Sequence, residues 1–263
     1  EAAQALEPAC WIAIRKADRI VLAGDHCQLP PTIKCYEAAR GGLEQTLMEK
    51  VVAGKPSAVS LLKVQYRMHE DIMRFSSDWF YGGELEAAPE ILHRGILDWD
   101  TPVTWLDTSG MDFKEEFVGE TFGRINKEEA GLLLKELEAY IQRIGGNRIL
   151  EERIDFGLIS PYKAQVQYLR GKIKGSASLR PYRSLITVNT VDGFQGQERD
   201  VIFISLVRAN EEGQIGFLND LRRMNVAITR ARMKLVILGE AATLSHHAFY
   251  KKLLEYVRTI NDK

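Results

Sequence analysis

Two arginines lie in the segment NVAITRARMKLVILG, residues 225–239, where an expected short helix is followed by an apolar run. A guanidinium group is planar and always charged, and it can bind a phosphate through two parallel N–H donors. Arg230 and Arg232 are therefore candidate ligands for a phosphate-bearing molecule. The alternative for the same two residues is a cationic helix C-terminus, where positive charge stabilises the helix dipole.

The segment VQYRMH, residues 64–69, places an aromatic side chain next to an arginine. A tyrosine at position 66 can stack on a base while Arg67 reaches phosphate oxygens. The alternative is a core tyrosine beside a surface arginine, which is the more common arrangement of such a pair. The pair alone leaves both interpretations open.

Polar or glycine-containing loops follow two expected strands. In LAGDHCQLPP, residues 22–31, Asp25 and Gln28 lie beyond the end of a strand, where open α/β sheets bind ligands, although Gly-Asp and Pro-Pro are also ordinary turn residues. In NTVDGFQGQERD, residues 189–200, glycines such as Gly196 let backbone amides approach an anion, and Glu198 can accept a hydrogen bond from a ribose hydroxyl. A β-bulge followed by a turn is the alternative for the second loop.

The elements that must position these residues alternate between short apolar strands and amphipathic helices. Strands are expected at residues 19–24, 103–107, 156–160, 185–191, 201–207 and 235–239, and such apolar runs are typical of a parallel sheet covered on both faces. Helices are expected over residues 126–144, with Asn126 as N-cap and Glu129 as its capping-box partner, and from about 245 to 260. This alternation predicts a doubly wound α/β fold.

A domain boundary is expected near residues 52–62, where AGKPSAVS separates a helical segment from LLKVQYRMH. The residues before this boundary, with one strand and one or two helices, are too few to form a domain. We therefore expect residues 1–58 to be the tail of one α/β lobe and residues 59–263 to form a complete second lobe.

The composition is that of an ordinary globular protein, with 45% hydrophobic residues, 27% charged residues and a net charge of -1. No acidic residue lies between Asp155 and Asp192, which indicates either a local polyanion track or a solvated basic surface. The basic residues of this stretch are Lys163, Arg170, Lys172, Lys174, Arg180 and Arg183.

The remaining features of the chain point to a reduced cytoplasmic environment without a membrane. Cys10, Cys27 and Cys35 lack the spacing of a zinc knuckle or a disulfide framework. No apolar run approaches the roughly 20 residues that a membrane helix needs, and no signal peptide opens the chain.

The order of six motifs connects these separate observations. The motifs are EAAQALE, GDHCQLPP, QYRMH, ISPYKAQ, TVDGFQGQE and RRMNVAITRAR, and together they span nearly the entire chain. With them the chain resembles the superfamily 1 helicases, in the branch of the nonsense-mediated-decay helicase and the immunoglobulin-mu-binding-protein helicase. The resemblance implies a RecA-like, doubly wound, mostly parallel α/β fold. Residues 59–263 would form the second lobe of a P-loop NTPase, and residues 1–58 would be the tail of the first.

The resemblance implies an ATP site that is shared by the two lobes. Glu1 would be the Walker B glutamate that activates the attacking water, and Gln28 would sense the γ-phosphate. Tyr66 would stack on the adenine, Arg67 would contact phosphate, and Gly196 and Glu198 would border the nucleotide, with Glu198 on the ribose. Arg230 would be the arginine finger, and Arg232 would be either a helix-end charge or a supporting charge.

The resemblance also implies a single strand of DNA or RNA as partner. Pro161, Tyr162, Lys163 and Thr190 would contact its backbone phosphates, so binding would depend on salt and little on sequence. The two nucleic acids are not distinguished by these residues. Family analogy suggests translocation from 5′ to 3′.

The sequence departs from the family pattern at the phosphate-binding loop, G-x-x-x-x-G-K-[ST]. The nearest string, GKPS at residues 54–57, lacks the upstream glycine and has Pro56 where serine or threonine is required. The aspartate that holds magnesium would precede Glu1. We therefore expect a carboxy-terminal fragment of a helicase that uses ATP and Mg²⁺, inactive by itself. The alternative is a non-catalytic, nucleic-acid-binding or regulatory RecA-like module.

Overall fold

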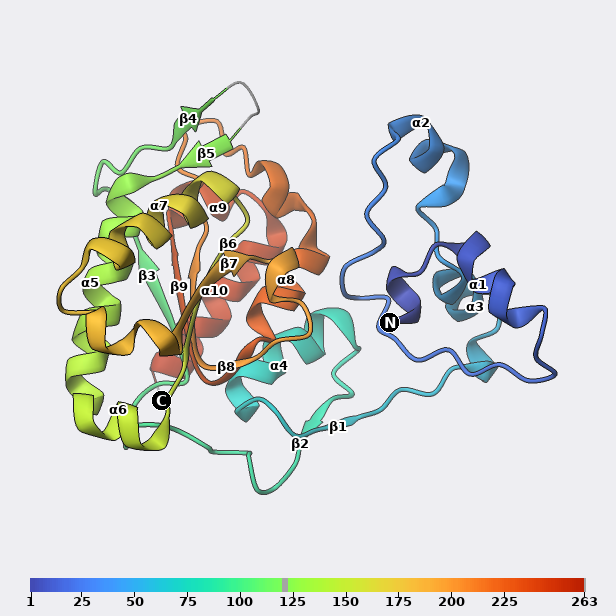
Figure 1. The fold of residues 1–263 in the computed structure, drawn as a ribbon, viewed down its shortest axis with the longest axis horizontal. Helices are drawn as coiled ribbons and strands as arrows, with labels where there is room; N and C mark the ends of the chain where they lie inside the picture. Colours follow the sequence, from blue (N-terminus) through green and yellow to red (C-terminus); the bar gives the residue numbers. More distant parts are fainter. Residues whose placement is uncertain (120–122, 263) are drawn as a thin grey trace. The chain divides into compact units, whose positions relative to one another are not determined.

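The protein is represented by a computed structural model that describes residues 1–119 and 123–262. The chain forms two compact units, residues Glu1–Lys63 and Val64–Lys263, which are considered separately below (Figure 1). The assignment of residues 1–58 and 59–263 to two lobes of a longer motor stays a prediction. None of the helices in the described ranges is long and apolar enough to cross a bilayer.

The smaller unit is built from helices and extended segments. Its elements are η1 (Ala2–Gln4), α1 (Glu7–Ile14), α2 (Tyr36–Ala38), η2 (Ala39–Leu43), α3 (Leu47–Gly54) and η3 (Pro56–Ala58). The prediction of a strand at residues 19–24 is wrong, because no strand forms within residues 1–63, all of which are described. A strand requires a neighbouring strand to pair with its backbone, and Val21 is instead almost fully exposed in a segment without regular secondary structure.

The larger unit contains a five-stranded sheet in the order β3-β9-β8-β6-β7, and every neighbouring pair is parallel. The strands are β3 (Val103–Asp107), β6 (Phe156–Ser160), β7 (Ile186–Thr190), β8 (Arg199–Ser205) and β9 (Ala231–Gly239). Each coincides with or overlaps a predicted strand. This mostly parallel α/β architecture confirms the predicted fold class.

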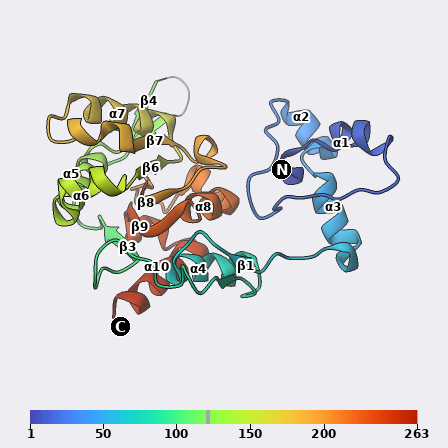
Figure 2. The same cartoon turned by 60° about the horizontal axis from the view of Figure 1, so that its bottom comes forward.

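Helices cover both faces of this sheet, as Figures 1 and 2 show. One face carries α5 (Lys127–Ile144), α6 (Gly146–Glu152) and α7 (Lys163–Gly175). The other carries α4 (Glu70–Phe80), α8 (Leu221–Ile228), α9 (Ala241–Leu244) and α10 (Ala248–Asn261). Because successive side chains of a strand point to opposite faces, Phe156 and Leu158 of β6 pack toward α5 and α7, and the intervening Gly157 faces the other layer.

Of the two interactions predicted at the start of helix α5, the N-cap bond forms and the capping-box bond does not. The Asn126 side chain accepts a hydrogen bond from the Glu129 amide at 2.9 Å, which confirms the N-cap. The second half of the capping box does not form, because the Asn126 amide donates to Gln165 Oε1 at 3.0 Å. The Glu129 carboxylate instead accepts hydrogen bonds from Ser205 and Val207.

Two small sheets and several 3₁₀ turns complete the larger unit. The parallel pair β1 (Val64–Gln65) and β2 (Glu86–Ala87) lies at the bottom of Figure 1, and the antiparallel hairpin β4 (Glu116–Val118) and β5 (Gly123–Ile125) lies at the top. The 3₁₀ turns are η4 (Arg180–Leu185), η5 (Asp192–Phe194) and η6 (Gly216–Asn219).

Candidate functional site

A tight turn at residues 65–68 presents the predicted tyrosine and arginine. The Gln65 side chain closes this turn, since its Oε1 accepts from the amides of Arg67 at 2.8 Å and Met68 at 2.7 Å. Its Nε2 donates to the Met68 carbonyl at 2.8 Å. Tyr66 is 67% exposed, so it is not a core residue, and the alternative of a core tyrosine is wrong. Gln65 was not singled out from the sequence.

Arg67 reaches across the unit to the carboxylate of Glu198. Its Nε pairs with Glu198 Oε2, and its Nη1 donates to the Thr229 carbonyl at 3.2 Å. The second oxygen of Glu198 lies 3.1 Å from Arg232 Nε. Two guanidinium groups therefore hold one carboxylate between them, one arginine at each oxygen.

Arg232 also connects this carboxylate to a pair of aspartates, of which Asp200 is buried and Asp155 half-buried. Its Nη1 lies 3.2 Å from Asp200 Oδ1. Asp200 Oδ2 accepts a hydrogen bond from the Asp155 amide at 3.1 Å, and Asp155 Oδ1 accepts one from the Asp200 amide at 2.7 Å. Burial raises the pKa of Asp200, and the charge of Arg232 opposes this rise. Arg232 lies in strand β9, so it is not at a helix end. Its guanidinium is paired with two carboxylates, so it is not an unpartnered ligand for an anion.

Arg230 is buried directly before strand β9, with 2% of its surface exposed. Its Nε donates to the Val226 carbonyl at 2.9 Å, its Nη1 to the Gln197 carbonyl at 3.2 Å and its Nη2 to Thr229 Oγ1 at 3.1 Å. Val226 lies in the last turn of α8, so the guanidinium also satisfies a carbonyl at the end of that helix. This contact agrees with the helix-end alternative for Arg230.

The predicted nucleotide residues of the larger unit therefore gather at one edge of the sheet. Glu198 and Arg230 directly precede β8 and β9, whose amino ends are paired in register at Arg199 and Ala231. Gly196, in the same loop as Glu198, is exposed with a φ of +74°, a backbone conformation that favours glycine. The register of β8 shifts between Arg199 and Val201, so the loop leads into a β-bulge or a similar irregularity of the strand.

The smaller unit holds the two other predicted ATP residues. The amide of Ala2, next to Glu1, donates to the Ala23 carbonyl at 2.8 Å, which joins the first motif to the GDHCQLPP segment. Gln28 Nε2 donates to Asp25 Oδ2 at 2.8 Å. These contacts bring the first two motifs together within the unit.

Asp25, His26 and Cys27 form one group of potential metal ligands in the described ranges, with ligand atoms within 4.8 Å of one another. The two Asp25 oxygens already accept hydrogen bonds from the Cys27 amide at 2.9 Å and from Gln28 Nε2 at 2.8 Å. A histidine and a thiol also suit Mg²⁺ poorly, because this ion prefers oxygen ligands. The group therefore serves the turn, and it does not fit the expected magnesium.

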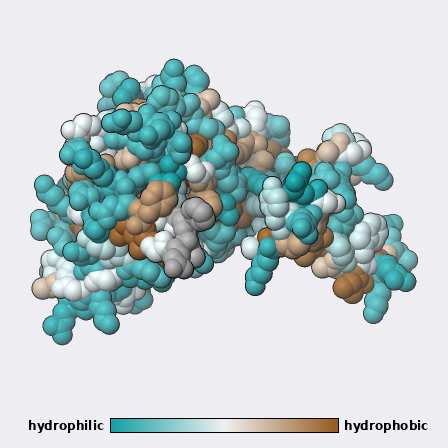
Figure 3. Space-filling model, turned by 90° about the horizontal axis from the view of Figure 1, so that it is seen from above, coloured by the Kyte–Doolittle hydropathy of each residue, from teal (hydrophilic) through white to brown (hydrophobic). Residues whose placement is uncertain are grey.

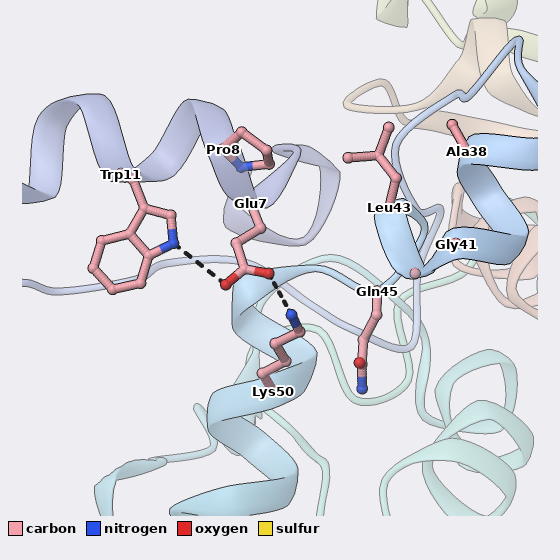
Figure 4. Close-up of a pocket in the computed structure, with 9 residues that line it drawn as sticks. Glu7, Pro8, Trp11, Ala38, Gly41, Leu43, Gln45 and Lys50 are labelled. Carbon is pink, nitrogen blue, oxygen red and sulfur yellow. Dashed lines mark hydrogen bonds and ion pairs between the residues drawn. The ribbon is translucent and has the colours of Figure 1, made fainter.

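A pocket in the smaller unit lies apart from these residues. Figure 4 shows Trp11 and Lys50 converging on Glu7, with Trp11 Nε1 3.3 Å from Glu7 Oε1. The pocket is lined by Glu7, Pro8, Trp11, Ala38, Gly41, Gly42, Leu43, Gln45 and Lys50. None of the predicted ATP or strand residues belongs to this lining.

The predicted strand contacts lie at the opposite edge of the sheet, after the carboxyl ends of β6 and β7. Pro161, Tyr162 and Lys163 follow β6, and Thr190 is the last residue of β7. Lys163 is exposed, whereas Pro161 and Thr190 are half-buried. Tyr162 is only 3% exposed, and burial raises the pKa of its hydroxyl. In this conformation Tyr162 supports the surface and does not present its ring to a strand.

The basic stretch beyond Lys163 is partly structural. Arg170 donates two hydrogen bonds to the Val188 carbonyl, at 2.9 and 2.6 Å. Arg183 donates to the carbonyls of Ile173 and Ser176 at 3.1 and 3.0 Å. Donors that bind backbone carbonyls are not available to a polyanion. Lys163 is the cation among the predicted strand contacts, and it is exposed.

Comparisons with known proteins identify the family. An AAA domain family model matches residues 43–242, and a second AAA domain model matches residues 1–35. The "DNA-binding protein SMUBP-2" of Mesocricetus auratus is 36% identical over 269 residues, which cover 97% of this chain and 26% of that protein. The "Regulator of nonsense transcripts 1 homolog" of Arabidopsis thaliana is 39% identical over 267 residues, which cover 98% of this chain and 20% of that protein.

Two further proteins are similar at different levels. The "DNA polymerase alpha-associated DNA helicase A" of Saccharomyces cerevisiae is 37% identical over 268 residues, with 93% of this chain and 38% of that protein covered. A solved C-terminal domain of a possible DNA helicase from Lactobacillus plantarum WCFS1 has a TM-score of 0.39 and 14% identity, with 70% of this chain and 96% of that chain covered.

The chain spans between 20% and 38% of the length of the three curated relatives. The first family model nevertheless covers most of the chain. The chain thus belongs to the AAA domain family matched over residues 43–242 and, with these relatives, to the superfamily 1 helicases in the branch of the nonsense-mediated-decay and immunoglobulin-mu-binding-protein helicases.

Proposed function

We propose that the chain is the carboxy-terminal part of an ATP-dependent helicase or translocase that moves along a single strand of nucleic acid. The observation that carries this proposal is the meeting of Arg67, Glu198 and Arg230 at the amino ends of β8 and β9. These residues come from three separate motifs, and the motifs are those that the family resemblance connects with ATP.

In this proposal the 65–68 turn and the loop before β8 bind the nucleotide. Tyr66 offers an exposed ring to the adenine, and Arg67 offers a cation to a phosphate. Glu198 accepts a hydrogen bond from the ribose, and Gly196 allows the backbone to come close. Arg67 is paired with Glu198 here, so binding a phosphate requires this ion pair to open. Arg232 then keeps one oxygen of Glu198 in place.

Arg230 is the proposed arginine finger. Phosphoryl transfer depends on positioning and on neutralising charge, and an arginine finger contributes about 10³–10⁵ in rate. To reach a phosphate, the buried Arg230 guanidinium must exchange contacts with Val226, Gln197 and Thr229 for phosphate oxygens. Such an exchange makes hydrolysis conditional on a rearrangement, as is common where chemistry is gated by conformation.

Glu1 and Gln28 keep the roles that the resemblance implies. ATP would supply the transferred phosphoryl group, and Mg²⁺ ligands would come from outside this chain.

A non-catalytic nucleic-acid-binding module is the second candidate. It is favoured by the burial of Arg230 in contacts within its own unit. In such a module, the guanidinium would serve only to join the end of α8 to the loop before β8.

The two candidates are distinguished by phosphate release in a longer version of the protein that includes a P-loop. We expect ATP hydrolysis to be stimulated by single-stranded DNA or RNA in the longer protein and to be undetectable in the 263-residue chain. Turnover by the 263-residue chain would contradict the proposed division of the active site. A longer protein that binds the strand without hydrolysing ATP would support the non-catalytic module.

A further inference from the structure

An exposed aromatic side chain, Phe217, lies on the turn η6, which follows strand β8 in the sequence. Its side chain is 57% exposed, and its ring lies 5.7 Å from that of Tyr162, with an angle of 44° between the two planes. Tyr162 is buried beneath it, directly after the predicted contact Pro161 and before Lys163. None of the six motifs includes Phe217.

Neighbours on both sides hold this turn rigidly. Ile215 and Leu218 are buried, and the Leu218 carbonyl accepts a hydrogen bond from the Tyr250 hydroxyl at 2.7 Å. Gly216 has a φ of +56°, and a side chain there would collide with the Arg208 guanidinium. The backbone of the turn is therefore constrained, and the Phe217 ring projects outward from it. A fixed ring loses little conformational entropy when a flat partner stacks on it.

The surroundings of Phe217 suit the stacking of one planar group on its ring better than the docking of another protein. Its neighbours Ile215 and Leu218 point inward, and Asn219 beside it is polar and exposed. The face of the larger unit seen in Figure 3 is mainly hydrophilic, with apolar residues in small areas. Protein docking sites usually offer a contiguous apolar patch of several hundred Å². A nucleic-acid base requires one aromatic face.

We propose that Phe217 stacks on a base of the bound single strand and so is a strand-binding residue at the carboxyl edge of the sheet. This inference rests on the proposed function, because it takes the strand to run past Pro161, Lys163 and Thr190. Lys163 neutralises phosphate charge, and Phe217 contributes a contact with the base. No lysine or arginine lies between Ala209 and Asp220, so the turn itself adds no cation for a phosphate.

Fluorescence anisotropy with labelled oligo-dT tests the inference on the full 263-residue chain at low salt. We expect Phe217→Ala and Phe217→Leu to raise Kd by roughly 5- to 150-fold, the range found for base stacking. Phe217→Trp, which keeps an aromatic face, should bind as the unaltered chain does. Thermal unfolding of each variant verifies the fold, and the exposure of Phe217 predicts little change in stability.

Two controls separate stacking from charge and from general surface effects. Trp99 is a fully exposed aromatic residue, but it precedes the amino end of β3, at the other edge of the sheet, so Trp99→Ala should leave Kd unchanged. Lys163→Ala should reduce the slope of log Kd against log salt by about 0.7, the value for one phosphate contact on a single strand. Phe217→Ala should leave that slope unchanged.

An oligonucleotide without bases gives the sharpest comparison. The unaltered chain and Phe217→Ala should bind this abasic strand equally, since it has no base on which a ring can stack. Equal binding of oligo-dT by the two proteins would overturn the inference about Phe217 and leave the proposed function standing. A failure of the unaltered chain to bind oligo-dT and oligo-U would overturn the strand-binding part of the proposed function, and the inference with it.

Discussion

The carboxyl group of Glu129 lies in the interior, at the first turn of α5. Its Oε1 accepts hydrogen bonds from Ser205 Oγ and from the Val207 amide at 2.9 Å, and its Oε2 has no hydrogen-bond partner. Burial raises the pKa of Glu129 to about 7, although the two hydrogen bonds act in the opposite direction. A carboxyl group without enough partners is easier to bury in its protonated, neutral form.

This burial predicts that stability depends on pH. Between pH 4.5, the ordinary pKa, and about 7, the folded state holds a proton that the unfolded state has released. The free energy of unfolding therefore falls as pH rises through this window. The total effect is about 3 kcal/mol, at about 1.4 kcal/mol per pKa unit. Urea unfolding at intervals between about pH 5 and pH 8 measures it.

Glu129→Gln provides the test, because glutamine keeps an acceptor for Ser205 and Val207 but does not titrate. The stability of this variant relative to the unaltered protein should increase with pH. Glu128→Gln is a matched control one residue away, with an exposed side chain, and it should keep the pH dependence of the unaltered protein. If the free energy of unfolding varied with pH in the same way for Glu129→Gln and the unaltered protein, the raised pKa of Glu129 would be contradicted.

At the scale of single residues, part of the candidate site could be predicted from the sequence. The motifs identified Arg67, Glu198 and Arg230, which do meet in the structure. The role of Gln65 in closing its turn depends on a particular side-chain rotamer. The contacts of Arg232 join positions that are 32 and 34 residues apart in the sequence. Such contacts are fixed by the packing of distant strands, which no local pattern encodes.

At the scale of elements, the hairpin β4–β5 is joined to the loop after β8 by one carboxylate. Glu115 accepts hydrogen bonds from Arg208 Nε at 2.6 Å and from the Ala209 amide at 3.1 Å, and it also pairs with Arg124. Arg208 and Glu115 are both buried at this contact. The same loop continues to the turn that carries Phe217, so the hairpin supports the proposed strand surface from behind.

Removing this carboxylate should be costly. Glu115→Ala leaves Arg208 as an uncompensated buried charge, which typically lowers the free energy of unfolding by about 3–5 kcal/mol. The next residue provides the control, because Glu116 pairs with Lys127 at the surface, where such pairs are worth about 0–1 kcal/mol. Urea unfolding of the two variants should therefore differ clearly. Equal losses would show that Glu115 does not hold the hairpin.

The elements predicted correctly were those with long apolar runs. Strands β3 and β6 match their predicted ranges because buried parallel strands are apolar on both faces. The hairpin β4–β5 was missed, since its three-residue strands include Glu116 and Arg124 and have no apolar run. The strand expected at residues 19–24 has the right composition, but no strand within residues 1–63 pairs with it. Strand formation depends on neighbours, which the local sequence does not reveal.

At the scale of the larger unit, one sheet separates the two proposed sites. The nucleotide residues lie at the amino ends of β8 and β9, and the strand residues lie beyond the carboxyl ends of β6 and β7. Residues 191–198 connect Thr190, at the carboxyl edge of the sheet, to the amino edge, where Glu198 lies. Hydrogen bonds from Gly193 to Thr190 Oγ1 at 3.3 Å and from Gln197 Nε2 to the Gly193 carbonyl at 2.9 Å fix this segment. These contacts connect Thr190 to Gln197, which directly precedes Glu198.

The measurement that tests the central claim most directly is strand-stimulated ATP hydrolysis by Arg230→Ala in the longer protein that includes a P-loop. We predict a kcat lower by about 10³–10⁵ and an unchanged affinity for the strand. Arg230→Lys should not restore turnover, because lysine lacks the forked donors of a guanidinium. Arg222→Ala, at a less buried arginine of the same motif, is the control and should hydrolyse ATP normally. Full turnover by a folded Arg230→Ala protein would contradict the account.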